Sequence, residues 1–240
     1  MLDPWTLSQW VLALSIANHQ LPPPAEGAPE LQVWSTNYVL HLAEEVASDD
    51  GHVILAPGDE PFPRAEPIHL TAVDWCQSAL QGSARVQRLD GSAVTLNYAT
   101  SEGVAVDCGP PLGNARWRSQ GRVRFGMAVG PWGDGVRGYQ LVPYRTLATD
   151  PNVIPTGSLV YVPSARGVPI EVDGQILAHD GWFFAADVGG AIHGVHIDTF
   201  TGTERQVGLP QVTNRADRTV TAVIVPSPML RGVMSGIHGR

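Results

Sequence analysis

Apolar residues follow two different patterns along this chain, and the pattern changes near residue 80. Before that point, longer apolar stretches alternate with Pro-rich connections at 20–27 and 57–67. Asp3-Pro4 ahead of the first stretch matches a helix N-cap followed by Pro at the first helical position. The spacing predicts an N-terminal helical region over residues 1–80, with helices at 4–19, 33–46 and 70–80 and one short strand at 52–56.

Beyond residue 80 the apolar segments become short, and Gly, Pro and Asp divide them. This texture is typical of an all-β barrel or sandwich. The chain is therefore predicted to be mainly β, with a β-rich domain over 81–240. The expected strands lie around Val86 and Val123 and at 94–98, 104–106, 141–142, 159–162, 170–172, 181–186, 193–200 and 220–225.

Charge is distributed unevenly. Nine Asp and Glu but no basic residue precede Arg64, which makes the N-terminal region acidic. The net charge of -8 argues against nucleic acid as a main partner. All 15 basic residues are Arg. Without lysine, Schiff-base chemistry, a Ser-Lys nucleophile and a P-loop phosphate site are excluded.

The two cysteines, Cys76 and Cys108, lack the spacing of a metal site. They form either one structural disulfide, as is common outside the cytoplasm, or two small buried apolar residues. No apolar run reaches 18 residues, so no transmembrane helix is expected. Residues 1–19 are apolar, but they contain Asp3 and no Lys or Arg, which argues against a secretory signal peptide.

The candidate chemistry gathers between residues 185 and 202. Asp187 ends an apolar run and precedes the Gly189-Gly190 pair, which can take positive φ. Because an Asp in such a turn accepts backbone N–H bonds, Asp187 is expected to stay ionised. Asp198 lies in an apolar strand-like segment, and burial there would raise its pKa. Two acids around one tight loop indicate a site.

The sequence at 145–163, RTLATDPNVIPTGSLVYVP, and at 179–202, HDGWFFAADVGGAIHGVHIDTFTG, carries a family resemblance. It resembles the three-aspartate (3D) domain and is similar to the catalytic domain of the membrane-bound lytic transglycosylase A family. The three aspartates correspond to Asp150, Asp187 and Asp198. The family commonly has Lys after Gly-Gly-Ala-Ile, where this chain has His193.

The resemblance implies a double-psi β-barrel in the C-terminal part, with the motif over 145–202. It also implies a peptidoglycan lytic transglycosylase, which cleaves between N-acetylmuramic acid and N-acetylglucosamine and forms a 1,6-anhydro sugar. Asp198 would be the general acid and base, with Asp187 beside it. No cofactor or metal is expected. The predicted substrate contacts are Asp150, Gly189, Gly190, His193 and Phe200.

Two alternatives remain open. One is a non-catalytic glycan-binding double-psi barrel. The other is a zinc-dependent cell-wall peptidase that uses His193, His196 and Asp198, with His179-Asp180 nearby in sequence. Strand alternation would put His196 and Asp198 on one face. A catalytic zinc site requires three convergent protein ligands, and this pair supplies two. The Arg-rich stretch 116–124, with Trp117, is either an exposed face or a contact for the carboxylates of peptide stems.

Peptidoglycan lies outside the cytoplasmic membrane, so the predicted location is the cell envelope, the periplasm or the extracellular space. With no signal peptide visible, export by a secretion system or delivery on a phage particle is the expected route. The acidic N-terminal helices would then be a docking module for a delivery or carrier protein.

Overall fold

The computed structural model describes residues 16–55, 67–101, 106–206, 208–209 and 212–240. The chain forms two compact units. Unit 1 comprises Met1–Tyr38 and Gly135–Arg240, and unit 2 comprises Val39–Asp134. The predicted domain boundary at residue 80 therefore falls inside unit 2.

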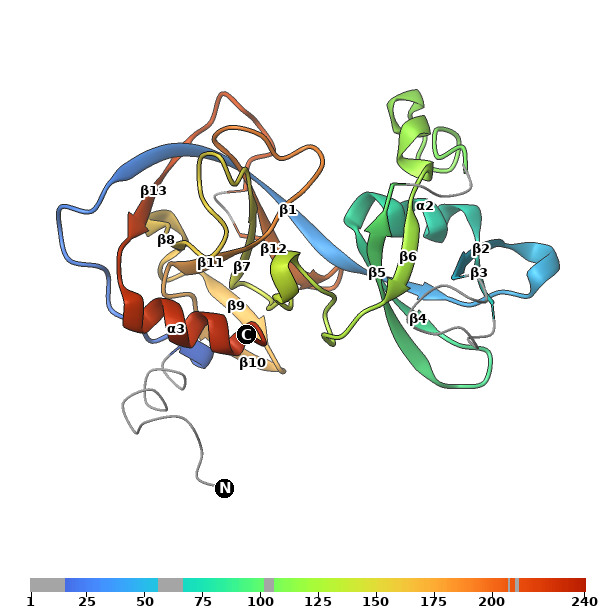
Figure 1. Ribbon diagram of the computed structural model, residues 1–240, viewed down its shortest axis with the longest axis horizontal. Helices are drawn as coiled ribbons and strands as arrows, with labels where there is room; N and C mark the ends of the chain where they lie inside the picture. Colours follow the sequence, from blue (N-terminus) through green and yellow to red (C-terminus); the bar gives the residue numbers. More distant parts are fainter. Residues whose placement is uncertain (1–15, 56–66, 102–105, 207, 210–211) are drawn as a thin grey trace, which may run out of the picture. The chain divides into compact units, whose positions relative to one another are not determined.

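Unit 1 is built mainly of strands (Figure 1). Its sheet has the order β12-β7-β11-β8-β13-β1, and β12 also pairs with β1. The pairing of β11 with β7 is parallel, whereas β12 with β7, β11 with β8, and β13 with both β8 and β1 are antiparallel. The strands are β1 (Glu30–Glu44), β7 (Thr146–Thr149), β8 (Leu159–Tyr161), β11 (Trp182–Asp187), β12 (His196–Thr203) and β13 (Val220–Val225).

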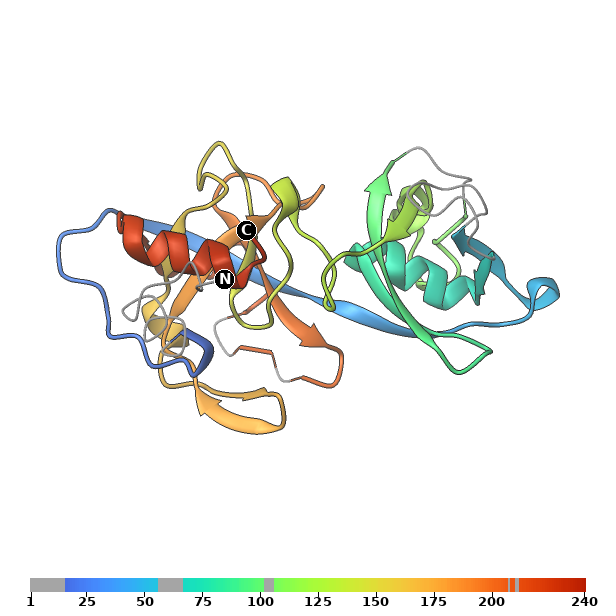
Figure 2. The same cartoon turned by 60° about the horizontal axis from the view of Figure 1, so that its bottom comes forward.

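Two shorter strands, β9 (Pro169–Val172) and β10 (Gln175–Ala178), form a separate antiparallel hairpin. Figure 2 shows this hairpin at the margin of unit 1. Ile170 on β9 is buried in the core of the unit, whereas Ile176 on β10 is 71% exposed. Leu177 on β10 also packs against this core, so both strands attach the hairpin to the unit. Two 3₁₀ turns, η3 (Val136–Gly138) and η4 (Pro163–Ala165), complete the local structure of unit 1.

Strand β11 is buried on both faces, as its continuous apolar sequence predicts. Phe183 and Ala185 pack into one apolar cluster, and Trp182, Phe184 and Ala186 pack into another. Because the side chains of a strand alternate between its faces, this strand links the two clusters. It ends at Asp187, where the buried segment gives way to a loop.

Helix α3 (Pro228–Ile237) covers one of these clusters. The Ser227 hydroxyl accepts a hydrogen bond from the Leu230 N–H, and Pro228 occupies the first turn, as a helix start requires. Leu230, Val233 and Met234 face the cluster formed by residues of β8, β11 and β13. Figure 1 shows α3, in red, lying alongside these strands.

Unit 2 has its own core and its own strand pairing. The second part of β1 pairs in parallel with β4, and the strand order continues through β5 to β6. Strands β2 and β3 form a separate antiparallel pair. The elements are η1 (Ser48–Asp50), β2 (His52–Leu55), β3 (Ile68–Leu70), α2 (Ala72–Gln81), β4 (Ser83–Gln87), β5 (Ala93–Thr100), η2 (Ala115–Gly121) and β6 (Arg124–Met127).

Helix α2 has well-formed ends. Thr71 Oγ1 accepts a hydrogen bond from the Asp74 N–H at 3.1 Å and donates to the Asp74 carboxylate at 2.7 Å. Gly82 ends the helix in the left-handed conformation, with φ 83°, which glycine adopts without a steric cost. The predicted helix at 70–80 is confirmed as α2.

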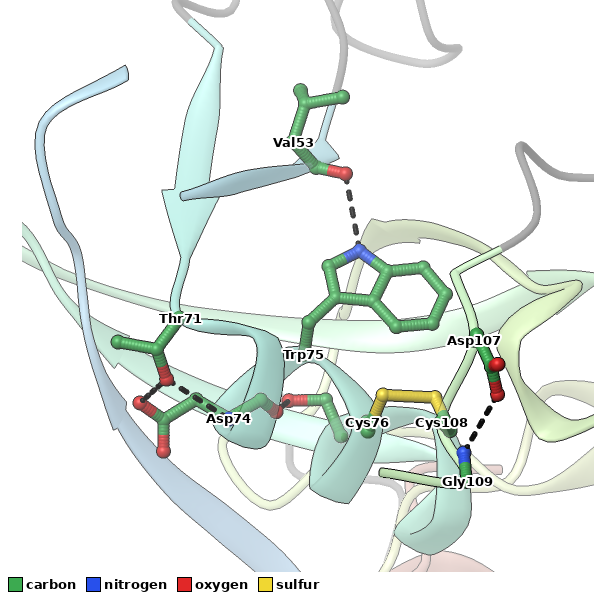
Figure 3. Close-up of a disulfide and its surroundings, with 9 residues drawn as sticks. Val53, Thr71, Asp74, Trp75, Cys76, Asp107, Cys108 and Gly109 are labelled. Atoms are coloured by element: carbon green, nitrogen blue, oxygen red, sulfur yellow. Dashed lines mark hydrogen bonds between the residues drawn. A yellow bond between two sulfur atoms is a disulfide. The ribbon is translucent and has the colours of Figure 1, made fainter. Parts of the chain in front are cut away.

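A disulfide joins Cys76 on α2 to Cys108, and both residues are fully buried (Figure 3). Beside it, Trp75 is buried and donates its indole N–H to the Val53 carbonyl at 3.1 Å. The disulfide and the β1–β4 pairing both tie residues before position 80 to residues after it. These two links explain why the predicted boundary does not separate the units.

Removing the disulfide is expected to destabilise unit 2. The bridge spans a sequence separation of 32 residues, and loss of its constraint on the unfolded chain costs about 3–4 kcal/mol. Chemical denaturation of a Cys76→Ala/Cys108→Ala variant measures this loss. As a matched control, dithiothreitol should weaken the wild type to a similar extent and leave the variant unchanged. A wild type that unfolds identically with and without the reductant would contradict this expectation.

Within the described part of residues 1–80, the predicted helical region instead contains strands β1, β2 and β3 beside helix α2. The predicted helix at 33–46 is wrong, because these residues lie in β1. Val33, Trp34, Thr36, Tyr38 and Val39 are β-branched or aromatic residues that favour strands. Their partners on β12 and β13 are about 160–190 residues away in sequence, and a local pattern cannot reveal them.

Other predicted elements have mixed outcomes. The helix at 4–19 falls mostly on residues 1–15, outside the described residues. Part of the strand at 104–106 does so too. Residues 141–142 form no strand, whereas β2, β8, β11, β12 and β13 confirm expected strands within a few residues. The mainly β fold is confirmed, and the double-psi connection remains a prediction. No helix in the described parts is long and apolar enough to span a membrane.

Candidate functional site

A row of polar and aromatic side chains runs along β1 and β12 in unit 1. Alternate residues of a strand share one face, and here alternate residues of the two strands meet. Trp34 stacks on His196, Thr36 bonds both His196 and Asp198, and Tyr38 packs against Phe200. The predicted placement of His196 and Asp198 on one face is thereby confirmed.

Asp198 is partly buried within this row. Its Oδ1 accepts a hydrogen bond from the Thr36 hydroxyl at 2.7 Å. Burial raises the pKa of Asp198 to about 6, and the bond from Thr36 opposes this rise by stabilising the carboxylate. The carboxyl can therefore hold a proton in mildly acidic conditions and release it near neutrality, as a general acid and base must.

Asp187 lies at the end of β11 and also reaches β1. Its Oδ2 accepts from the Tyr38 hydroxyl at 2.8 Å, and its Oδ1 accepts from the Val188 N–H at 2.8 Å. Burial nevertheless raises its pKa to about 7, and the nearby Asp198 charge adds to the rise. Burial also raises the pKa of Tyr38, so its hydroxyl stays protonated and donates.

The expectation that Asp187 stays ionised is therefore wrong. The predicted backbone hydrogen bond exists, but the desolvation of the carboxylate outweighs it. Near neutral pH the carboxyl is divided between its neutral and charged forms. The site thus contains two carboxyls, both with pKa values above the ordinary range.

His196 is held on both sides. Its ring stacks on Trp34 with 3.5 Å between centroids and 11° between planes. Its Nε2 lies 2.8 Å from Thr36 Oγ1, and its Nδ1 lies 3.4 Å from the Ala191 carbonyl. Burial lowers the pKa of His196, which favours a neutral ring at the pH where Asp198 titrates.

Asp150 holds a loop together. Its Oδ2 accepts from the Gly194 N–H at 2.8 Å, and its Oδ1 accepts from the Asn152 N–H and side-chain amide. These bonds, the one from Gly194 first, lower the pKa of Asp150. Gly194 has φ 63°, a left-handed conformation suited to glycine. Asp150 thus fixes the loop between β11 and β12 from the end of β7.

Substitution of Asp150 by Ala is expected to destabilise unit 1, because the Gly194 N–H loses its acceptor. The β11–β12 loop should also become more mobile. Thermal unfolding and amide hydrogen exchange at Gly194 measure both effects. Asn152→Ala is the matched control, because it removes one side-chain bond to Asp150 and keeps the bond to Gly194. Equal stability of Asp150→Ala and wild type would contradict this role.

The other predicted substrate contacts in this loop, Gly189, Gly190 and His193, differ in exposure and packing. Neither Gly189 nor Gly190 takes positive φ. A Cβ at Gly189 would come within 2.6 Å of Ile192, so this glycine is needed for close packing, whereas Gly190 is exposed with open space around it. His193 is also exposed. Gly190 and His193 therefore remain accessible to a ligand.

Phe200 does not fit its predicted role as a substrate contact. It is fully buried on β12, and its ring lies 5.2 Å from that of Tyr38 between centroids. Because it is buried within the row and lies against the ring of Tyr38, it supports Tyr38. The aromatic residue of the motif is thus structural in this chain.

The His179-Asp180 pair belongs to a different, buried cluster. Among the described residues, one group of His, Cys, Asp and Glu has a geometry that could hold a metal, namely His19, His179 and Asp180. Both nitrogens of His179 are already bonded, one to the Tyr144 carbonyl and the other to the Gly181 N–H. Asp180 forms a buried ion pair with Arg145. Through His19, this cluster holds the N-terminal segment against the rest of unit 1. It is separate from His196 and Asp198.

Sequence reasoning missed Trp34, Thr36 and Tyr38, which complete the site. They lie in the segment predicted as a helix. The signal that could have identified them is the alternation Trp-x-Thr-x-Tyr, with strand-favouring residues at every second position.

Comparison with known proteins finds a family-model match within unit 1 and solved structures of similar fold. Residues 145–215 match the family model described as the 3D domain. The crystal structure of E. coli MltA with bound chitohexaose has a TM-score of 0.52 and 18% identity, over 82% of this chain and 72% of that chain. The membrane-bound lytic murein transglycosylase from Agrobacterium tumefaciens has a TM-score of 0.53 and 16% identity, over 92% and 85%. No curated protein sequence matches the chain.

The predicted resemblance to the 3D domain is confirmed by these matches. The chain has an MltA-like fold, and both Asp187 and Asp198 lie in the matched segment. Thr36 and Tyr38 lie outside it and reach the aspartates from β1.

Proposed function

We propose that this protein is a peptidoglycan lytic transglycosylase and that Asp198 is its general acid and base. One observation carries the proposal. A partly buried carboxyl with a pKa raised to about 6 lies within the segment that matches the 3D domain. The MltA-like fold supports the same reading.

The proposed reaction needs only one group that exchanges a proton. The glycosidic oxygen is a poor leaving group, so protonated Asp198 gives it a proton as the bond to the anomeric carbon breaks. The carboxylate that remains then takes a proton from the 6-hydroxyl of N-acetylmuramic acid. That oxygen attacks the same anomeric carbon, and a 1,6-anhydro sugar forms. No water enters the product, and Asp198 regains its proton.

Asp187 supports this chemistry in the fraction of molecules in which it is ionised, a fraction that reaches about half near pH 7. Positive charge develops on the sugar ring as the glycosidic bond breaks, and a neighbouring carboxylate stabilises that charge. Tyr38 and Val188 hold the two oxygens of Asp187 in place. Exposed Gly190 and His193 are the proposed contacts to the glycan beyond the reacting sugar.

The proposed location is the cell envelope or the extracellular space, where this substrate occurs. The Cys76–Cys108 disulfide supports it, since such bonds persist mainly in oxidising compartments.

Mass spectrometry of the soluble fragments released from purified sacculi tests the proposal. A lytic transglycosylase releases muropeptides that end in a 1,6-anhydro sugar, which borohydride does not reduce. Reducing-end sugars would instead indicate a hydrolase. Released peptides, with loss of activity on chelation, would indicate a zinc peptidase. Tight sacculus binding without fragments would indicate a glycan-binding barrel. Each of these three outcomes contradicts the proposal.

A further inference from the structure

The Thr36 hydroxyl occupies a position between two titratable side chains of β12. Its oxygen lies 2.7 Å from Oδ1 of Asp198 and 2.8 Å from Nε2 of His196. A hydroxyl has one hydrogen to donate. When Thr36 donates it to the ionised Asp198, the bond from His196 must run the other way, with an Nε2–H donating to the Thr36 oxygen.

The two contacts of His196 favour opposite tautomers, because the Ala191 carbonyl can only accept and would take its hydrogen bond from an Nδ1–H. The imidazole Nδ1 is 3.4 Å from the Ala191 carbonyl, longer than the 2.8 Å that separates Nε2 from Thr36. The shorter contact is the better place for the single N–H of a neutral ring. Stacking on Trp34 at 3.5 Å fixes the plane of the ring, so that Nε2 points at the hydroxyl.

We propose that Trp34, His196 and Thr36 form a positioning chain that reserves Oδ1 of Asp198 as a hydrogen-bond acceptor. Oδ2 is then the atom that gives its proton to the glycosidic oxygen and later takes one from the 6-hydroxyl. The inference rests on the proposed function. It assigns both proton transfers of Asp198 to one oxygen, Oδ2. Thr36, His196 and Trp34 act through Asp198 and are positioning residues.

Among the described residues, other titratable groups also act on Asp198 or on its partners. Asp187 on β11 and Tyr38 on β1 interact electrostatically with Asp198, and His193 acts on His196. The effect of Thr36 is separable from theirs, because its bond stabilises the carboxylate whereas burial and neighbouring negative charge destabilise it.

The test uses the full chain and NMR. Carboxyl ¹³C shifts give the pKa of Asp198, and long-range ¹H–¹⁵N spectra give the tautomer of His196. Thr36→Val removes the hydroxyl and keeps the shape, so the pKa of Asp198 should rise by about 1–2 units. Thr36→Ser keeps a hydroxyl and should restore the wild-type value. Ser35→Ala, a loss of a hydroxyl one residue away, should leave it unchanged.

Turnover provides a second readout that a purely structural role would not give. Thr36→Val should lower kcat by about tenfold, with KM changed less than about twofold, because the acid is misplaced and the substrate contacts are kept. Its pH–rate profile should move to higher pH together with the pKa of Asp198. Thr36→Ser should recover both.

Two results would overturn the inference. One is an unchanged pKa of Asp198 in a folded Thr36→Val variant, and the other is a His196 ring that carries its proton on Nδ1 while Asp198 is ionised. Both are read by NMR without substrate. A wild type that binds sacculi and releases no anhydro sugars would instead refute the proposed function and leave the two NMR results to be judged by themselves.

Discussion

Replacing Asp198 with Asn should reduce the rate of glycan cleavage by about 10²–10⁴-fold. The amide cannot donate a proton to the glycosidic oxygen or accept one from the 6-hydroxyl. Its Oδ1 can still accept the bond from Thr36, so the local structure should survive. The rate is measured as release of soluble fragments from labelled sacculi at pH 5–6, where the wild-type carboxyl is substantially protonated.

Asp173→Asn is the matched control for this loss. Asp173 is exposed, and its φ of 50° suits asparagine. This variant makes the same chemical change outside the site and should keep wild-type activity. An Asp198→Asn protein that folds normally and cleaves at more than about a tenth of the wild-type rate would exclude Asp198 as the acid.

The second large effect concerns stability and pH. The folded state raises the pKa of Asp187 from 3.8 to about 7 and that of Asp198 from 3.8 to about 6. Between pH 3.8 and these raised pKa values, the folded protein binds more protons than the unfolded chain. The stabilisation is fully present below about pH 4 and is lost as the pH rises through 6 and 7. Unit 1 should therefore be less stable at pH 8 than at pH 5.

Replacing Asp187 with Asn should remove most of this pH dependence. The amide oxygen can accept from Val188, and the amide nitrogen can donate to the Tyr38 oxygen, so both partners are kept. At pH 8 the variant should be more stable than the wild type by about 2–4 kcal/mol. Denaturant unfolding at pH 5 and pH 8, followed by a probe in unit 1, measures the difference.

Asp217→Asn is the matched control for this pH effect, because Asp217 is exposed and paired with Arg215. It should leave the stability profile of unit 1 unchanged. If the wild type were as stable at pH 8 as at pH 5, or if Asp187→Asn were the weaker protein at pH 8, then Asp187 would be an ordinary ionised carboxylate. In that case the account of burial at this residue would be wrong.

The sequence revealed the aspartates of the site better than the residues of β1 that contact them. The aspartates at 150, 187 and 198 stand in a motif whose order and spacing can be recognised without coordinates. The mainly β character also follows from local patterns, because short apolar segments between Gly, Pro and Asp are limited to short strands. Apolar strand β11, ending at Asp187, is an example.

What could not be predicted depends on contacts far apart in the chain. Thr36 meets Asp198 across 162 residues, and Tyr38 meets Asp187 across 149. The ionisation of Asp187 was predicted from its turn alone, where backbone hydrogen bonds favour the charge. Burial instead raises the pKa of Asp187, and this burial depends on tertiary packing that includes the contact with Tyr38 of β1. Because a helix was predicted at 33–46, neither the Thr36–Asp198 contact nor the Tyr38–Asp187 contact was expected.

Digestion of sacculi in H₂¹⁸O by wild type and by Asp198→Asn tests the central claim most directly. The account predicts that wild type releases anhydro-muropeptides with no ¹⁸O at the anomeric carbon, since the 6-hydroxyl of the sugar is the attacking group. Asp198→Asn should release almost none. Reducing sugars carrying ¹⁸O, or equal release by the two proteins, would contradict it.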